Sequence, residues 1–231
     1  MEAFKAYAEA NDWSLLLPEM VLAFGSLLLL VKEAIRKSDR VSGGGIALLM
    51  QGTLLLYLAL GYLSFDPNTS LTSFNGLIKQ SYRVDVMRCF FVGCSFLTCL
   101  LVTPFLRERR LPVAEFHAIS SLAAAGMMLL VQSNHFLMLF VSLETVAVCF
   151  YVLVGYHQGS SRSLEAGLKY LVFGAMSSAI LLFGIALLYG AAGNPAGREV
   201  VLVSGAPPDI LSFSWLSDFT KAHPDDLFLR A

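Results

Sequence analysis

The chain has 231 residues, of which 56% are hydrophobic and only 14% are charged, and its mean hydropathy is +0.67. A soluble domain carries about a quarter charged residues, so this composition excludes an ordinary soluble enzyme and predicts a polytopic membrane protein. The 16 Lys and Arg nearly balance the 17 Asp and Glu, leaving a net charge of -1. This balance argues against nucleic-acid binding and against an acidic disordered tail.

Six apolar runs predict an all-α transmembrane helical bundle that forms a single membrane domain over residues 1–231. The first run ends in VKEAIRK and lacks a small-residue cleavage site, which favours a retained helix over a signal peptide. The segment 191–224 contains four prolines and is predicted to be an extramembrane loop, and residues 225–231 to begin a further helix, so we expect a truncated chain. The predicted spans cover residues 13–31, 45–63, 86–106, 113–132, 134–155 and 164–190.

Charged residues near the span ends are expected to lie at the membrane interface. Glu19 falls in the first two turns of the first span, where a carboxylate is well tolerated, and Arg88 is close enough to the start of the third span to snorkel outward. Between the second and third spans, residues 66–85 are turn-rich and too polar to cross. The fourth span contains AISSLAAAGMM, whose small residues allow close helix packing in lipid.

The distribution of Lys and Arg between the connections predicts the orientation of the bundle. The connections on one side carry five Lys and Arg residues, and those on the other side carry eight. The positive-inside rule places the richer set in the cytoplasm and the N-terminus outside. The poorer set is Lys5, Lys79, Arg83, Arg198 and Lys221, and the richer set is Lys32, Arg36, Lys37, Arg40, Arg107, Arg109, Arg110 and Arg162.

The fifth and sixth spans, joined by HQGSSRS, are predicted to form an antiparallel hairpin with one ionisable group deep in each helix. Glu144 lies 11 residues before Gly155, which at about 1.5 Å per residue places it about 16 Å into a core about 30 Å thick. Lys169 lies 6 residues beyond Ser163, or about 9 Å in from the same side. Ionised groups at such depths are costly, at about 3 kcal/mol on the lenient insertion scale, and usually face protein or water.

A carboxyl and an ammonium in this arrangement can load and release a proton. Desolvation raises the pKa of a carboxyl group and a nearby ammonium lowers it, so small movements of Lys169 could switch the protonation of Glu144. Alternatively, Glu144 only fixes helix packing by hydrogen bonding, and Lys169 reaches the cytoplasmic headgroups. Tyr151 lies on the face of Glu144, where packing is the simpler role, and Glu165 is most simply a partner of the helix dipole. Small residues on the sixth span predict a packing stripe formed by Gly167, Gly174 and Ser178.

Motifs for soluble catalysis, nucleotide binding or metal binding are absent from the sequence. The histidines, His117, His135, His157 and His223, are scattered near span ends and are interpreted as interfacial polar residues rather than ligands. Cys89, Cys94 and Cys99 recur every five residues, so they do not converge on one helix face, and we expect no metal or iron-sulfur cluster in this chain.

The motifs SLETVAVCFYVLVGY and SLEAGLKYLVFGAMSSAILLFGIALLYGAAG closely resemble the N subunit of bacterial NADH-quinone oxidoreductase, respiratory complex I. LLPEMVLA, VDVMRCF and LVQSNHFLMLF extend the resemblance from Leu15 to Gly193. It implies an antiporter-like fold with inverted repeats and broken helices. It also implies that Glu144 matches the family's essential glutamate and Lys169 its LEAxLKY lysine.

The resemblance further implies a multi-pass subunit of the bacterial inner membrane that moves protons beside other membrane-arm subunits. NADH and quinone would be used by the whole complex, with no cofactor bound and no redox chemistry performed by this chain. Two alternatives remain open, a cation/proton antiporter subunit of the same module family and a purely structural membrane subunit.

Overall fold

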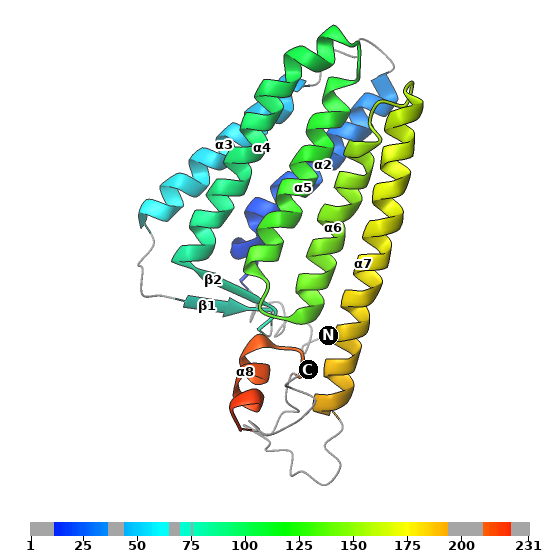
Figure 1. Cartoon of the computed structure of the whole chain (residues 1–231). Helices are drawn as coiled ribbons and strands as arrows, with labels where there is room; N and C mark the ends of the chain where they lie inside the picture. Colours follow the sequence, from blue (N-terminus) through cyan, green and yellow to red (C-terminus); the bar gives the residue numbers. More distant parts are fainter. Residues whose placement is uncertain (1–11, 37–43, 65–69, 75, 194–209, 223–231) are drawn as a thin grey trace.

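The computed structural model describes residues 12–36, 44–64, 70–74, 76–193 and 210–222. Within these residues, six helices are long and apolar enough to cross a bilayer, which confirms the predicted all-α membrane fold. Successive helices run in opposite directions (Figure 1). They are α2 (Leu17–Arg36, preceded by the 3-10 turn η1, Trp13–Leu16), α3 (Gly44–Ser64), α4 (Tyr82–Glu108), α5 (Val113–Gln132), α6 (Phe136–Val154) and α7 (Ser161–Gly193).

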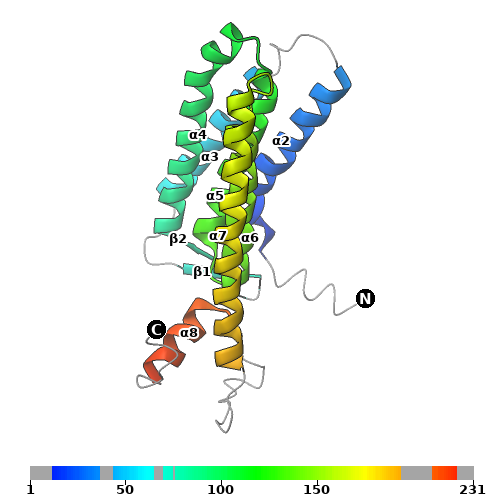
Figure 2. The same cartoon turned by 45° about the vertical axis from the view of Figure 1, so that its right-hand side comes forward.

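Helix α5 forms the centre of the bundle and packs against α2, α3, α4 and α6. Its inward residues are small, including Ala118, Ala124 and Ala125, and they are buried. Small side chains let helix backbones approach closely, which supplies packing energy in lipid, where apolar burial offers no contrast. Helix α7 packs along α6 at the edge of the bundle, and most of its side chains are exposed (Figures 1 and 2).

A short antiparallel β-hairpin closes one end of the bundle (Figure 1). Its strands, β1 (Ser70–Ser73) and β2 (Ile78–Ser81), lie in the segment predicted to be turn-rich and extramembrane. Ile78 and Gln80 of β2 are buried while Lys79 between them is exposed, because successive strand residues point to opposite faces. The side chains of Ile78 and Gln80 therefore point toward the ends of the helices.

The corner between α5 and α6 is bound to two other segments. On one side the backbone N–H of Asn134 donates to Leu77 O of the hairpin at 2.9 Å. On the other side the N–H of Phe136 donates to Leu211 O at 2.9 Å, and the Phe136 and Phe213 rings meet edge to face at 4.7 Å between centroids. Residues distant in sequence thus meet at the first turn of α6.

Helix α8 (Phe213–Ala222) lies within the segment 191–224 that was predicted to be a loop. It is too short to cross a bilayer and carries polar residues, so span-length hydropathy could not find it. Helix α7 also continues to Gly193, beyond the predicted end at residue 190. The helix predicted to begin at 225 lies outside the described residues.

The ends of the bundle differ in charge. The described basic residues of the richer set lie at the end opposite the hairpin, and those of the poorer set lie at the hairpin end (Figure 1). The assignment of the richer end to the cytoplasm stays a prediction. The richer end carries Lys32, Arg36, Arg107, Arg109, Arg110 and Arg162, the hairpin end carries Lys79, Arg83 and Lys221, and Lys5, Lys37, Arg40 and Arg198 lie outside the described residues.

Candidate functional site

Glu144 lies near the middle of α6, half-buried against the bundle. Its Oε1 atom is buried and has no hydrogen-bond partner within the described part of the chain. Helix α5 approaches this turn closely, since a Cβ atom on Gly126 would lie 2.9 Å from Val146 Cγ2 and 3.4 Å from Thr145 Cγ2. An ionisable group at membrane depth with an unsatisfied oxygen is the pattern expected of a functional residue.

Tyr151 extends the Glu144 face toward α7. The ring of Tyr151 meets Tyr170 edge to face at 5.3 Å between centroids, and its hydroxyl is hydrogen-bonded to Ser178 and interacts electrostatically with Glu144. Tyr151 therefore both packs between the two helices and belongs to the polar surroundings of Glu144.

The glycines of α7 permit this contact. A Cβ atom on Gly174 would lie 2.1 Å from the Tyr151 hydroxyl oxygen, and one on Gly167 would lie 3.0 Å from Gly155 Cα. Such distances leave no room for a side chain. The stripe predicted from Gly167, Gly174 and Ser178 is confirmed, because these positions form the side of α7 that meets α6.

The structure does not bring Lys169 to Glu144. Among the described residues, the carboxylate that pairs with Lys169 is that of Glu165, with Nζ donating to Oε1 at 2.6 Å. Both side chains are exposed, at 66% and 62%. Glu165 is thus the i,i+4 ion-pair partner of Lys169. Helix α7 begins at Ser161, so Glu165 lies beyond its first turn, and the interpretation as a partner of the helix dipole was wrong.

A second polar cluster was not predicted. Arg88 donates to the Glu19 carboxylate through Nε and Nη2, both at 2.8 Å, and to Asp85 Oδ1 through Nη1 at 3.1 Å. Glu19 is 2% exposed and Arg88 3% exposed, so the predictions of an interfacial Glu19 and an outward-snorkelling Arg88 were wrong. Two helices bring opposite charges together, which satisfies both groups inside the protein. The i,i+3 spacing of Asp85 and Arg88 was the available signal.

A third polar cluster joins α3, α4 and α5. Gln51 is fully buried, and its Nε2 donates to Ser121 Oγ at 2.7 Å and to Ser95 Oγ at 3.1 Å. One turn away on α5, His117 is also fully buried, with its ring nitrogens 3.0 Å from Thr103 Oγ1 and 3.1 Å from Gly44 O. The interfacial interpretation of His117 was therefore wrong, because neighbouring helices supply its hydrogen bonds.

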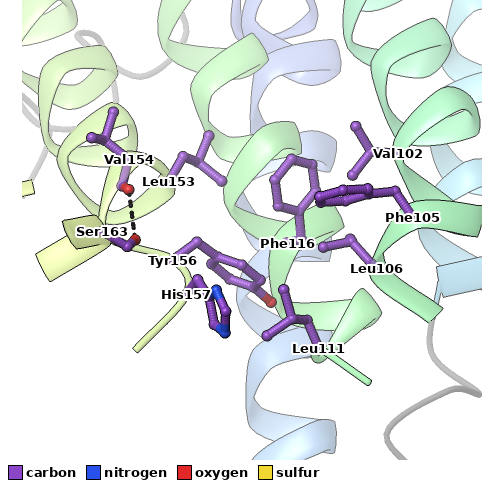
Figure 3. Close-up of a pocket in the computed structure, with 10 residues that line it drawn as sticks. All are labelled: Val102, Phe105, Leu106, Leu111, Phe116, Leu153, Val154, Tyr156, His157 and Ser163. Atoms are coloured by element: carbon purple, nitrogen blue, oxygen red, sulfur yellow. Dashed lines mark hydrogen bonds between the residues drawn. The ribbon is translucent and has the colours of Figure 1, made fainter. Parts of the chain in front are cut away.

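A cavity of about 270 Å³ lies at the end opposite the hairpin, between the ends of α4 and α6 and the α6–α7 turn (Figure 3). Its lining is mainly aromatic and aliphatic, and Phe116 and Tyr156 meet edge to face across it at 5.4 Å between centroids. The Tyr156 hydroxyl donates to Pro112 O, and burial raises the pKa of Tyr156. This tyrosine therefore secures the α6–α7 turn to the start of α5.

The six-helix fold, with polar groups buried between its helices, defines a multi-pass membrane protein. Residues 133–215 match the family model described as NADH:quinone oxidoreductase/Mrp antiporter, TM. This region contains Glu144, Tyr151, Glu165 and Lys169.

The whole chain aligns with NADH-quinone oxidoreductase subunit N 1 of Opitutus terrae at 41% identity, spanning 45% of that protein. Subunit N of Rhodospirillum rubrum is 35% identical over 82% of the chain and 39% of its own length. Among solved structures, respiratory complex I from Thermus thermophilus contains a similar chain, with a TM-score of 0.60 and 26% identity over 77% of this chain and 37% of that one.

The chain belongs to the family of NADH-quinone oxidoreductase subunit N. It spans less than half the length of the curated relatives that it matches. An archaeal membrane-bound sulfane sulfur reductase contains the same fold, with a TM-score of 0.60 at 19% identity over 77% of this chain and 37% of that one.

Proposed function

We propose that this chain forms part of a proton-translocating membrane-arm subunit of bacterial NADH-quinone oxidoreductase. Glu144 is the proton-accepting group and Lys169 is an electrostatic modulator. NADH oxidation and quinone reduction take place in other subunits, and this chain holds no redox group. The subunit lies in the inner membrane, with the hairpin end outside and the arginine-rich end in the cytoplasm.

One observation carries the proposal: the Glu144 carboxyl is held in the middle of α6 with a buried oxygen that has no partner among the described residues. A purely structural carboxyl in lipid would be expected to satisfy both oxygens with neighbouring helices. An unsatisfied oxygen instead leaves a place for a proton or a water molecule. Tyr151, which interacts electrostatically with Glu144, supplies a hydroxyl on the same side.

Lys169 forms no direct ion pair with Glu144 among the described residues, so its proposed effect on Glu144 is indirect. Its ammonium group is bound to Glu165, 2.6 Å away and one turn earlier on α7. A lysine with a nearby carboxylate partner can exchange that partner for another when helices move, and this exchange alters the field at a neighbouring acid. Moving one proton against 100 mV takes about 2.3 kcal/mol, which corresponds to a change of fewer than about two pKa units.

A second candidate is a cation/proton antiporter subunit. It is favoured by the description of the matching family, which includes Mrp antiporters as well as the quinone oxidoreductase. The two candidates share the Glu144 site and differ in the energy source. Sodium-dependent proton transport without NADH oxidation would support the antiporter.

The direct test is Glu144→Gln in the full-length subunit within the intact complex. Glutamine keeps the shape of the side chain and cannot ionise, so NADH-driven proton uptake into inverted vesicles should fall sharply while the complex remains assembled. The matched control is Glu108→Gln, which removes an exposed carboxylate at the end of α4 and should leave uptake unchanged. Wild-type proton uptake in the assembled Glu144→Gln complex would favour the structural role and overturn the proposal.

A further inference from the structure

The buried cluster around Arg88 contains more acid than base. Arg88 contributes one positive charge, and Glu19 and Asp85 contribute two carboxylates. All three side chains lie inside the bundle, with exposures of 3%, 2% and 7%. An uncompensated charge is strongly disfavoured in a buried site, and such a group takes up a proton instead.

Within the described part of the chain, Arg88 is the cation that pairs with both carboxylates. Its Nε and Nη2 atoms face Glu19, Nη2 also donates to Leu15 O at 3.1 Å, and Nη1 faces Asp85. Titratable groups from three helices and from the segment before α2 face the cluster or its rim. They are Asp12, Glu19 of α2, Tyr57 of α3, and Asp85, Arg88 and Cys89 of α4. The neutral amides of Gln80 from β2 and Gln132 from α5 also face it.

Two buried amides border the carboxylates, and each has an oxygen atom that needs a hydrogen-bond donor. Gln132 Nε2 donates to Glu19 Oε1 at 2.8 Å, and Gln80 Nε2 donates to Asp85 Oδ1. Each side chain is less than a tenth exposed, yet the Oε1 atom of each has no hydrogen-bond partner among the described residues. A buried carbonyl oxygen requires a donor, which a water molecule or the O–H of a protonated carboxyl can supply.

A cavity gives water access to this place. It has a volume of about 180 Å³ and lies between the start of α2 and the end of α3. Gln80, Asp85 and Arg88 form its polar side, and it reaches the surface at Ser14 and Gly61, which are both exposed. The volume is sufficient for several water molecules.

We propose that Glu19 and Asp85 together bind one exchangeable proton, taken from and returned to water in this cavity at the hairpin end of the bundle. On uptake, a hydronium ion transfers its proton to a carboxylate oxygen and leaves a water molecule in the cavity, and release reverses this step. The site is separate from Glu144, which lies on α6 in the middle of its helix. The inference concerns proton occupancy alone and does not depend on proton pumping by Glu144.

The test uses the full-length subunit in its assembled complex. A hydrophobic carbodiimide reacts with protonated carboxyl groups, and peptide mass spectrometry identifies the labelled residue. In the wild type, labelling at Glu19 or Asp85 should occur at neutral pH and decrease as the pH rises. In Glu19→Gln, Arg88 balances the one remaining carboxylate, so the carbodiimide labelling of the cluster should fall about tenfold. Asp85→Asn should reduce labelling at Glu19 in the same way, and exposed Glu108 should respond to neither change.

Infrared difference spectra provide a second measurement that does not require reagent access. Two difference spectra are recorded at neutral pH, wild type minus Glu19→Gln and wild type minus Asp85→Asn. Each should contain the carbonyl stretch of one protonated carboxylic acid. The absence of this band from both would overturn the proposal, whatever the labelling. Suppression of the band by sodium at constant pH would overturn it as well, because the site would then bind a metal cation. Glu144→Gln should leave the band unchanged, which separates this result from the test of pumping.

Discussion

The hydroxyl of Tyr151 occupies the space in which a side chain at Gly174 would have to lie, because a Cβ atom there would fall 2.1 Å from the hydroxyl oxygen. This relationship sets the spacing of α6 and α7 beside Glu144. Changing the residue at position 174 should therefore alter both stability and the surroundings of the carboxyl group.

Gly174→Ala should destabilise the α6–α7 contact by about 1–3 kcal/mol, the usual cost of overpacking a well-packed site. Thermal unfolding of the purified full-length protein in detergent would measure the change. The control is Gly184→Ala in the same helix, where no described atom other than the neighbouring backbone of α7 lies within 4 Å of the added Cβ, so its stability should be close to that of the wild type. Equal effects of the two substitutions would mean that α6 and α7 are not packed as described.

Gln51→Met should weaken the polar cluster of α3, α4 and α5 by about 0.6 kcal/mol, the average for side-chain hydrogen bonds between membrane helices, and by no more than about 1.7 kcal/mol. The substitution keeps the size of the side chain and removes the hydrogen bonds to Ser121 and Ser95. Thr53→Val is the matched control, because the exposed Thr53 hydroxyl bonds only to carbonyls of its own helix among the described residues. Chemical unfolding in mixed micelles would compare the two variants.

Lys169 and Glu165 should couple weakly as long as the outer face of α7 is exposed. Exposed i,i+4 ion pairs contribute about 0.3–0.5 kcal/mol, and salt screens them. A double-mutant cycle with Lys169→Met and Glu165→Gln, read by thermal unfolding at two salt concentrations, would measure the coupling. A coupling several times larger and insensitive to salt would show that another helix covers the pair in the full-length protein.

Tyr156 should make stability fall at high pH. Burial raises the pKa of its phenol above the ordinary value of 10.0. The folded state then holds the proton more tightly than the unfolded state, so the stabilisation is complete below about pH 10 and is lost as the pH rises beyond it. Tyr156→Phe should remove this pH-dependent part while also losing the hydrogen bond to Pro112 O. The unfolding temperature of the wild type should approach that of the variant as the pH rises above about 10, and parallel curves would contradict the expectation.

The spans could be predicted because length and apolar composition suffice to recognise a membrane helix. The packing stripe on α7 could also be predicted from the sequence, since small residues recur at helical spacing. The pairing of Glu19 with Arg88 could not be predicted from the sequence, because the two residues are 69 positions apart and each lies where interfacial exposure is the simpler interpretation. The i,i+4 spacing of Glu165 and Lys169 in LEAGLKY is sufficient to predict their ion pair.

The hairpin and α8 escaped prediction for a different reason. Each is a short polar segment whose order depends on contacts with the corner at Asn134 and Phe136, and local sequence carries little information about such contacts. Likewise, hydropathy placed Glu144 at depth but could not identify what surrounds its carboxyl group, since that depends on Gly126 and Tyr151 from different turns and helices.

The backbone bonds at Asn134 and Phe136 make the two ends of α6 mechanically unequal. The first turn is anchored on two sides, by the hairpin and by the segment leading into α8, whereas the last turn meets α7 through a pair of glycines, Gly155 and Gly167. Tilting of α6 would therefore swing its glycine end about a fixed pivot at Asn134. Glu144 lies between the pivot and the swinging end, so a small rotation would displace its carboxyl group sideways across the bundle while hardly changing its depth.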